Sequence, residues 1–121
     1  MKVAQVLDVD FRTEEGREAV QAMLLKIPAI AKRHDEDAQV PLEALEKVIG
    51  MICRKYNVMI WYITPTYIPG EVNMYSVTLK TTDTLQWLNN VYGCCLYEAV
   101  AKTAIALYAY IKSGKVAKKE E

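Results

Sequence analysis

The sequence predicts an α+β fold, in which an antiparallel sheet packs against helices. Residues 58–64, 72–80 and 85–91 are rich in β-branched and aromatic side chains, and short polar connections separate them, as in a three-stranded meander. Residues 93–111 are rich in alanine and typical of a long helix. Helical periodicity also occurs twice before the first of these strands. With a further strand at the N-terminus, the expected order is strand, helix, helix, three strands, helix.

Composition limits the possible functions. The chain has 121 residues, so we expect one domain over residues 1–112 and a disordered, lysine-rich tail over residues 113–121. Its 15 basic and 15 acidic side chains cancel, so the net charge indicates neither nucleic acid nor an acidic substrate. Ten of the 11 aromatic side chains fall within residues 41–111, which is more apolar surface than a small monomer easily hides. This excess favours self-association.

The cysteines and the hydropathy pattern predict a cytoplasmic protein. Cys53, Cys94 and Cys95 are odd in number and two of them are adjacent, so they are not a disulfide framework and indicate a reducing compartment. The first residues lack the uninterrupted apolar segment of a signal peptide. No stretch approaches the length that spans a bilayer, so no membrane partner is expected.

The N-terminal third predicts one strand, one helix and one loop. Along residues 3–11 the odd positions are mostly apolar and the even positions end in two aspartates. This alternation indicates a strand with one polar end. Thr13 suits an N-cap, and the apolar residues that follow recur at helical spacing. Pro28 ends or kinks this helix. Residues 32–39 are polar and charged and predict a loop.

The middle of the chain predicts a second helix and the sheet. Pro41 suits the first helical position, and an apolar stripe follows as far as Tyr56. Residues 65–70 contain two prolines and one glycine, which indicates a turn. Residues 85–91 are predicted as the third strand, and the competing interpretation is a short helix capped by Asp83.

The helix predicted at residues 93–111 has two apolar stripes. The first runs from Leu96 to Ile111 and faces the sheet. A helix that is apolar on two faces is normally buried on most of its surface. We therefore expect the second stripe to contact a second copy of the chain in a homodimer. The predicted interface residues are Tyr97, Ala101, Ala104 and Tyr108.

The ends and the polar side of this helix are also predicted. Cys95 takes the N-cap position and Glu98 the third helical position, which is the spacing of a capping box. Glu98 and Lys102 are four residues apart in the favourable order and are expected to mark the solvent side. Gly114 is expected to end the helix.

Residues 74–112 resemble the C-terminal half of small phage and prophage proteins of unknown function, sometimes described as a phage ABA-sandwich domain. These proteins carry a strand with a tryptophan, a turn of small residues and an alanine-rich helix. The resemblance implies a phage origin and a fold, and it implies no activity. It depends on Trp87, Tyr92-Gly93, Glu98-Ala99 and Ala101-Lys102.

The layout of residues 41–112, helix, three strands, helix, is also similar to the double-stranded RNA-binding domain. The run from Ala101 to Ala104 is similar to the closing helix of that family. The family places a lysine cluster at the start of this helix, whereas residues 94–99 contain one glutamate and no base. Nucleic-acid binding is therefore kept as the alternative to protein interaction, because shape without phosphate contacts provides little affinity.

Two acidic motifs are candidates for a reaction site and a metal site. Asp8 and Asp10 are placed as in the nucleophile pair of haloacid dehalogenase-like phosphatases, but Arg12 stands where that family needs Thr or Val. His34 precedes three acidic residues that would suit a hard cation, although no glycine-centred calcium loop is present. For both motifs a solvated polar segment is the simpler interpretation.

The cysteines and aromatic residues offer two further candidates. Cys94-Cys95 lacks the CxxC spacing of zinc sites, and Cys95 at a helix N-terminus is either a reactive thiol or a small buried side chain. Aromatic strand residues suit a platform for bases or a small ligand, a core, or a subunit interface, and the interface is favoured over a ligand site. The aromatic residues in question are Trp61, Tyr62, Tyr67, Tyr75 and Trp87.

No acid, base or nucleophile constellation is apparent in the sequence. The leading hypothesis is a non-enzymatic, cytoplasmic homodimer that acts through protein–protein contacts, without cofactor or metal. The sequence does not decide whether the protein binds a small-molecule ligand.

Overall fold

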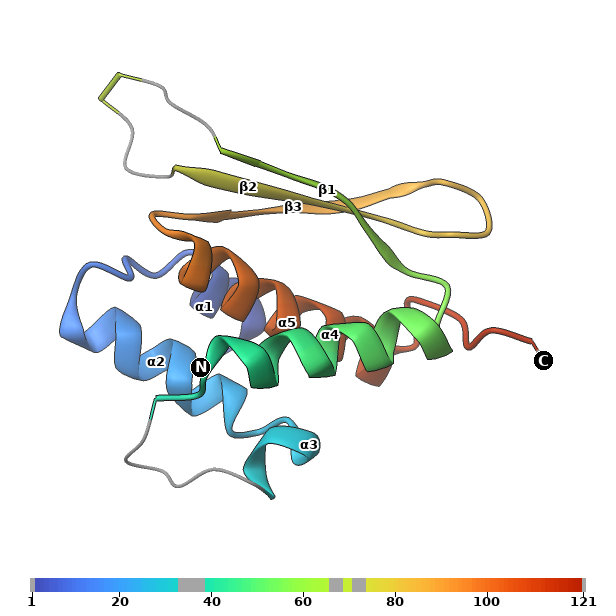
Figure 1. The fold of residues 1–121 in the computed structure, drawn as a ribbon, viewed down its shortest axis with the longest axis horizontal. Coiled ribbons are helices and arrows are strands. Elements are labelled where there is room, and N and C mark those ends of the chain that lie inside the picture. Colours follow the sequence, from blue (N-terminus) through green and yellow to red (C-terminus); the bar gives the residue numbers. More distant parts are fainter. Residues whose placement is uncertain (1, 33–38, 66–68, 71–73, 121) are drawn as a thin grey trace.

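The computed structural model describes residues 2–32, 39–65, 69–70 and 74–120. A layer of helices lies on one side of a three-stranded antiparallel sheet, which confirms the α+β class (Figure 1). The elements are α1 (Val3–Leu7), α2 (Glu14–Leu24), α3 (Pro28–Ala31), α4 (Leu42–Lys55), β1 (Met59–Pro65), β2 (Tyr75–Lys80), β3 (Trp87–Gly93) and α5 (Leu96–Ser113).

The predicted N-terminal strand is wrong, because residues 3–7 form helix α1. Val3 and Leu7 share a face in either a strand or a helix, whereas Val6 joins them only in a helix. Val6 is completely buried, and α1 contacts α2 and α5. Burial of this face against the helical layer therefore decides the conformation.

Helices α2 and α4 follow the predicted patterns. The Thr13 hydroxyl accepts a hydrogen bond from the Gly16 backbone N–H at 2.9 Å, as expected of an N-cap. Helix α2 ends at Leu24, before Pro28, which opens the short helix α3. Pro41 is the N-cap of α4, one position before the predicted one. Residues 33–38, most of the predicted loop, lie outside the described part of the chain.

The predicted meander is confirmed, with strand order β1-β2-β3. Val77 on the central strand pairs with Ile63 of β1 and with Val91 of β3. Leu85 has φ 56°, outside strand geometry, so β3 begins only at Trp87. Of the predicted turn at residues 65–70, residues 66–68 are not described.

Helix α5 is the central element of the molecule. It runs from the N-cap Cys95 to Gly114, whose φ of 73° ends it as predicted. Every residue from Glu98 to Leu107 is buried, because the sheet covers one side of the helix and α1, α2 and α4 cover the other (Figure 1). The prediction that Glu98 and Lys102 face solvent is wrong, since each is 2% exposed.

The C-terminal segment is not disordered over the residues that the structure describes. Helix α5 includes Ser113, and Val116 is buried. The Asn57 N–H donates to the Ala117 carbonyl at 2.8 Å, and the Lys119 N–H donates to the Lys55 carbonyl at 2.8 Å. These bonds attach the segment to the junction of α4 and β1, so the predicted boundary at residue 112 does not end the ordered chain.

Candidate functional site

One face of the sheet is not covered by any of the described helices. Val77, Leu79 and Val91 on the other face are buried against the helical layer. The helices all lie on that inner side, and the opposite side of the sheet is open (Figure 1). This open side is the candidate functional site.

The exposed face of the three strands, which we call the outer sheet face, is defined by the pairing register. Laterally paired residues of neighbouring strands point to the same side of a sheet. Val77 and Leu79 on β2 point toward the helices, so the residues that alternate with them point away. Together with their partners on β1 and β3, these residues form three outward-facing rows across the strands. The rows contain Thr64, Ser76 and Tyr92; Tyr62, Thr78 and Asn90; and Met59, Lys80 and Trp87, which Trp61 joins from the bulge in β1.

Two irregularities bring the tryptophans to this face. The pairing of β1 with β2 shifts between Ile60 and Tyr62, so Trp61 lies on the same side as Tyr62. The Lys80 ammonium lies 4.4 Å from the centroid of the Trp61 ring, which shows that both side chains are on the outer side. A second shift lies between Leu79 and Lys80 in the pairing with β3, and it places Trp87 opposite Lys80. Regular alternation would not bring these residues together.

Four aromatic side chains dominate the exposed area. Trp61 is 47% exposed, Tyr62 51%, Trp87 61% and Tyr92 49%. The Trp87 indole N–H donates to the Asn90 side-chain oxygen at 3.1 Å, and the Asn90 amide donates to the Tyr92 hydroxyl at 3.5 Å. The aromatic side chains of β3 are therefore held in place while their rings remain accessible.

The electrostatics of the outer sheet face are simple. Lys80 is the only charged residue among the ten that define this face, and none of the ten is acidic. The central strand contributes Ser76, Thr78 and Lys80, between the aromatic side chains of β1 and β3. A face with these side chains suits apolar contact better than proton transfer.

The predicted interface stripe of α5 lies mostly inside the protomer. Ala101 and Ala104 are completely buried, and Tyr97 and Tyr108 are partly buried. The Tyr97 hydroxyl donates to the Val40 carbonyl and receives a hydrogen bond from the Gln21 amide at 2.9 Å. Because α2 and α4 of the same chain cover this side of α5, a second copy has little access to the stripe. The surplus of exposed apolar surface lies on the sheet instead.

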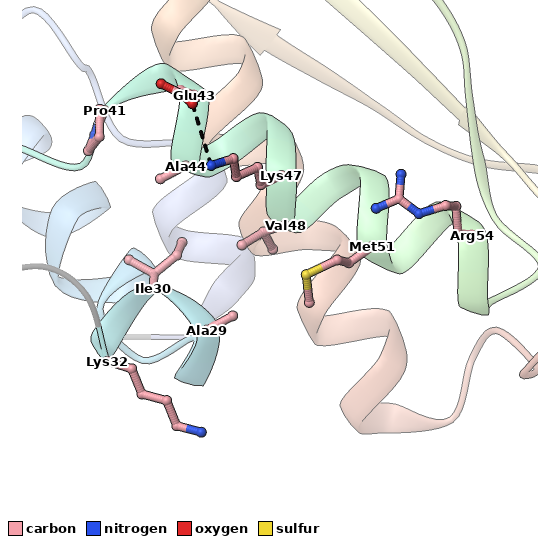
Figure 2. Close-up of a pocket in the computed structure, with 10 residues that line it drawn as sticks. All are labelled: Ala29, Ile30, Lys32, Pro41, Glu43, Ala44, Lys47, Val48, Met51 and Arg54. Atoms are coloured by element: carbon pink, nitrogen blue, oxygen red, sulfur yellow. Dashed lines mark ion pairs between the residues drawn. The ribbon is translucent and has the colours of Figure 1, made fainter.

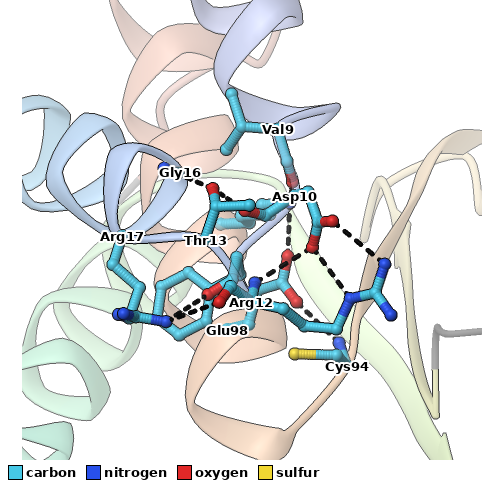
Figure 3. A network of polar contacts seen from close by, with 10 residues as sticks. Val9, Asp10, Arg12, Thr13, Gly16, Arg17, Cys94 and Glu98 are labelled. Carbon is cyan, nitrogen blue, oxygen red and sulfur yellow. Dashed lines mark hydrogen bonds and ion pairs between the residues drawn. The ribbon is translucent and has the colours of Figure 1, made fainter.

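Glu98 and Lys102 form a buried ion pair that joins the N-terminal segment to α5. Figure 3 shows Glu98 beside Cys94 and the N-terminal segment. The Lys102 ammonium lies 2.5 Å from a Glu98 carboxylate oxygen and donates to the Val9 carbonyl at 2.9 Å. The other Glu98 oxygen accepts the Cys94 backbone N–H at 2.6 Å. Each charged group has a hydrogen-bonded partner, so this network is structural.

The two aspartates of the predicted phosphatase-like motif are not brought together in a cavity. Both Asp10 oxygens accept hydrogen bonds at 3.0 Å from the guanidinium of Arg12 (Figure 3). These bonds hold the pKa of the Asp10 carboxyl below its usual range. Asp8 is exposed at the end of α1. Arg12, which departs from the phosphatase pattern, therefore holds the Asp10 carboxylate in an ion pair.

Cys94 is expected to react slowly with alkylating reagents. Partial burial, together with the neighbouring Glu98 carboxylate, raises the pKa of the Cys94 thiol to about 12. Because the thiolate is the reactive form, native protein at pH near 8 should leave the Cys94 thiol largely unmodified by iodoacetamide. Tandem mass spectrometry, which distinguishes modification of Cys94 from that of the adjacent Cys95, measures this, with urea-unfolded protein as the control. Rapid modification of Cys94 in the native protein would contradict the assignment.

The predicted cation site at His34 and the predicted aromatic residue Tyr67 lie outside the described part of the chain. Tyr75 is partly buried at the start of β2 and packs against the core. Among the described residues, no three histidine, cysteine, aspartate or glutamate side chains come together as metal ligands. None of the described helices combines the length and apolar character that crossing a bilayer requires.

A groove of about 610 Å³ lies between α3 and α4 (Figure 2). Apolar side chains such as Ile30, Val48 and Met51 line it, and Lys32, Lys47 and Arg54 lie along it. Its acidic residue, Glu43, pairs with Lys47 at 3.4 Å. The lining combines aliphatic surface with surface charges and assembles no nucleophile with an acid or base.

No family model, curated protein or solved structure matches this chain.

Proposed function

We propose that this protein is a non-enzymatic, homodimeric protein-interaction module whose subunits pack their outer sheet faces against each other. The observation that carries the proposal is the group of four roughly half-exposed aromatic side chains on one open face. Exposed apolar patches of this kind mark interaction surfaces, and aromatic residues are enriched in the buried centres of interfaces.

The available area supports a dimer contact. A large aromatic side chain buries about 150–250 Å² when fully covered, so four half-exposed ones offer roughly 300–500 Å² of apolar surface per subunit. A stable interface needs about 800 Å² per partner. The exposed side chain of Met74, just before β2, supplies further area.

Shape and charge favour a second copy as the occupant. In a two-fold arrangement the aromatic side chains of one subunit would pack against those of the other, as in packed sheets. Each subunit brings one cation to the contact, and Lys80 is already placed over Trp61. Repulsion between the faces is therefore small.

Trp87→Glu is expected to weaken the dimer by about 30-fold or more, because truncating a central aromatic anchor typically costs about 2 kcal/mol or more and a buried carboxylate adds to that. Light scattering across a micromolar dilution series measures the dissociation constant. Leu96→Glu is the matched control, since Leu96 is 40% exposed at the start of α5 and lies off the sheet. A wild-type protein that remains monomeric and soluble would refute the proposal, and equal weakening by the control would move the contact away from the sheet.

The origin of the chain stays a prediction. The likeness to phage and prophage proteins would be tested by the identity of the neighbouring genes. The alternative function, nucleic-acid binding, is supported by a separate observation at another surface.

A further inference from the structure

Six exposed basic side chains gather at the end of the molecule where both long helices finish, and we call this surface the basic end. Helices α4 and α5 run in the same direction, so their C-terminal turns lie at the same end, beside the C-terminus (Figure 1). The basic end consists of Arg54, Lys55, Lys112, Lys115, Lys118 and Lys119, all of which are exposed.

The fold holds the last of these residues in place. Lys118 forms an isolated antiparallel bridge with Tyr56, and the backbone of Lys119 bonds that of Lys55. The Lys119 ammonium donates to the Cys53 carbonyl at 2.9 Å. The C-terminal lysines and the basic side chains of α4 thus form one fixed surface.

This concentration of charge is not balanced locally. Within the described part of the chain, none of the six bases forms an ion pair with a carboxylate. The acidic residues in the adjoining described segments are Asp83, in the turn beside Asn57, and Glu120. A surface with six bases and two acids has a positive potential although the chain as a whole is neutral.

Helix stability accounts for only part of the cluster. Arg54, Lys55 and Lys112 lie in the last turns of their helices, where cations offset the helix dipole. Lys119 bonds the Cys53 carbonyl in the last turn of α4. Lys115 and Lys118 follow the C-cap of α5 and have no such role. Their convergence on the helix ends points to an external anion.

We propose that the basic end binds the phosphate backbone of nucleic acid, without base specificity. Nucleic acid fits better than a membrane surface, because the exposed aromatic side chains that a peripheral protein would insert into lipid lie on the sheet. The tyrosines of this end, Tyr108 and Tyr110, lie under Lys112 and Lys115. The site is at the opposite end of α5 from the phosphate-binding position implied by the likeness to the double-stranded RNA-binding domain. It does not depend on the dimer.

The test compares the wild type with a fourfold variant, Arg54→Gln, Lys55→Gln, Lys112→Gln and Lys118→Gln. Lys119 is kept because its ammonium bonds the Cys53 carbonyl. The control variant has the same net charge change at exposed bases elsewhere, Lys2→Gln, Lys26→Gln, Lys32→Gln and Lys47→Gln. Fluorescence anisotropy with labelled duplex DNA measures affinity over a salt series, after urea unfolding has confirmed that both variants are folded.

Each phosphate contact contributes about −0.9 to the slope of log affinity against log salt, so six contacts should produce a slope of about −5. The fourfold variant should retain a slope of about −2 and bind far more weakly at low salt, whereas the control should resemble the wild type. Absence of binding at low salt, or an equal loss in the control, would overturn the proposal. Binding to vesicles of anionic phospholipid without binding to DNA would overturn it in favour of a membrane surface.

Discussion

Replacing Glu98 by alanine should lower the free energy of unfolding by about 3–5 kcal/mol, because it leaves the buried Lys102 ammonium without its counter-charge. Both side chains are 2% exposed, so water cannot easily solvate the remaining charge. The Cys94 N–H also loses its acceptor at 2.6 Å. Urea unfolding, with the midpoint and the slope fitted together, measures the loss.

The double variant Glu98→Leu with Lys102→Met is the control for this effect. It removes both charges and keeps similar volumes, and apolar replacement of a buried pair is often neutral or stabilising. The Cys94 N–H and the Val9 carbonyl remain unpaired, at about 1 kcal/mol or more each, so we expect a smaller loss than in Glu98→Ala. A Glu98→Ala variant that loses less than about 1 kcal/mol would show that the ion pair is not buried in solution.

Gly16→Ala should destabilise the protein by about 3 kcal/mol, at the upper end of overpacking effects. A Cβ at this position would lie 2.0 Å from the Asp10 carbonyl oxygen and 2.7 Å from its carbonyl carbon. Both atoms belong to the backbone, which cannot rotate away as a side chain can. The turn of residues 8–12 or the first turn of α2 must shift, and thermal or urea unfolding would detect the change.

Gly50→Ala provides the matched control, since it makes the same chemical change inside helix α4. The nearest atom to a Cβ at Gly50 is a guanidinium nitrogen of Arg54 at 3.2 Å, at the end of a flexible side chain. Alanine is favoured over glycine in a helix interior by about 1 kcal/mol, so this variant should be more stable than the wild type. Equal destabilisation by both changes would contradict the close approach at Gly16.

The local signals predicted most elements, because side-chain periodicity and caps act within a few residues. Thr13, Cys95 and Gly114 take the predicted helix-terminal positions. The meander follows from three short runs of strand-forming residues. The prediction for residues 3–11 was wrong because Val3 and Leu7 fit both periods, and contact with α2 and α5 selects the helix, in which Val6 shares their face.

The candidate surfaces were less accessible to sequence reasoning. Strict alternation does not reveal that two register shifts carry Trp61 and Trp87 to one face with Lys80. In the sequence, the lysines after the last helix resemble a free tail. Only the structure shows the backbone hydrogen bonds that join this segment to residues 55–57. Both surfaces join residues distant in the chain, and periodicity carries no information about such pairs.

The sequence by itself determined the fold class, the three strands and the long alanine-rich helix, since these depend on propensities and short-range spacing. The tertiary structure decided which apolar surface is left over. It covers Ala101 and Ala104 with helices of the same chain, draws the Glu98–Lys102 pair into the interior and leaves the outer sheet face open. The physical reason is that burial depends on how elements far apart in the chain pack together, and only the folded arrangement specifies that packing.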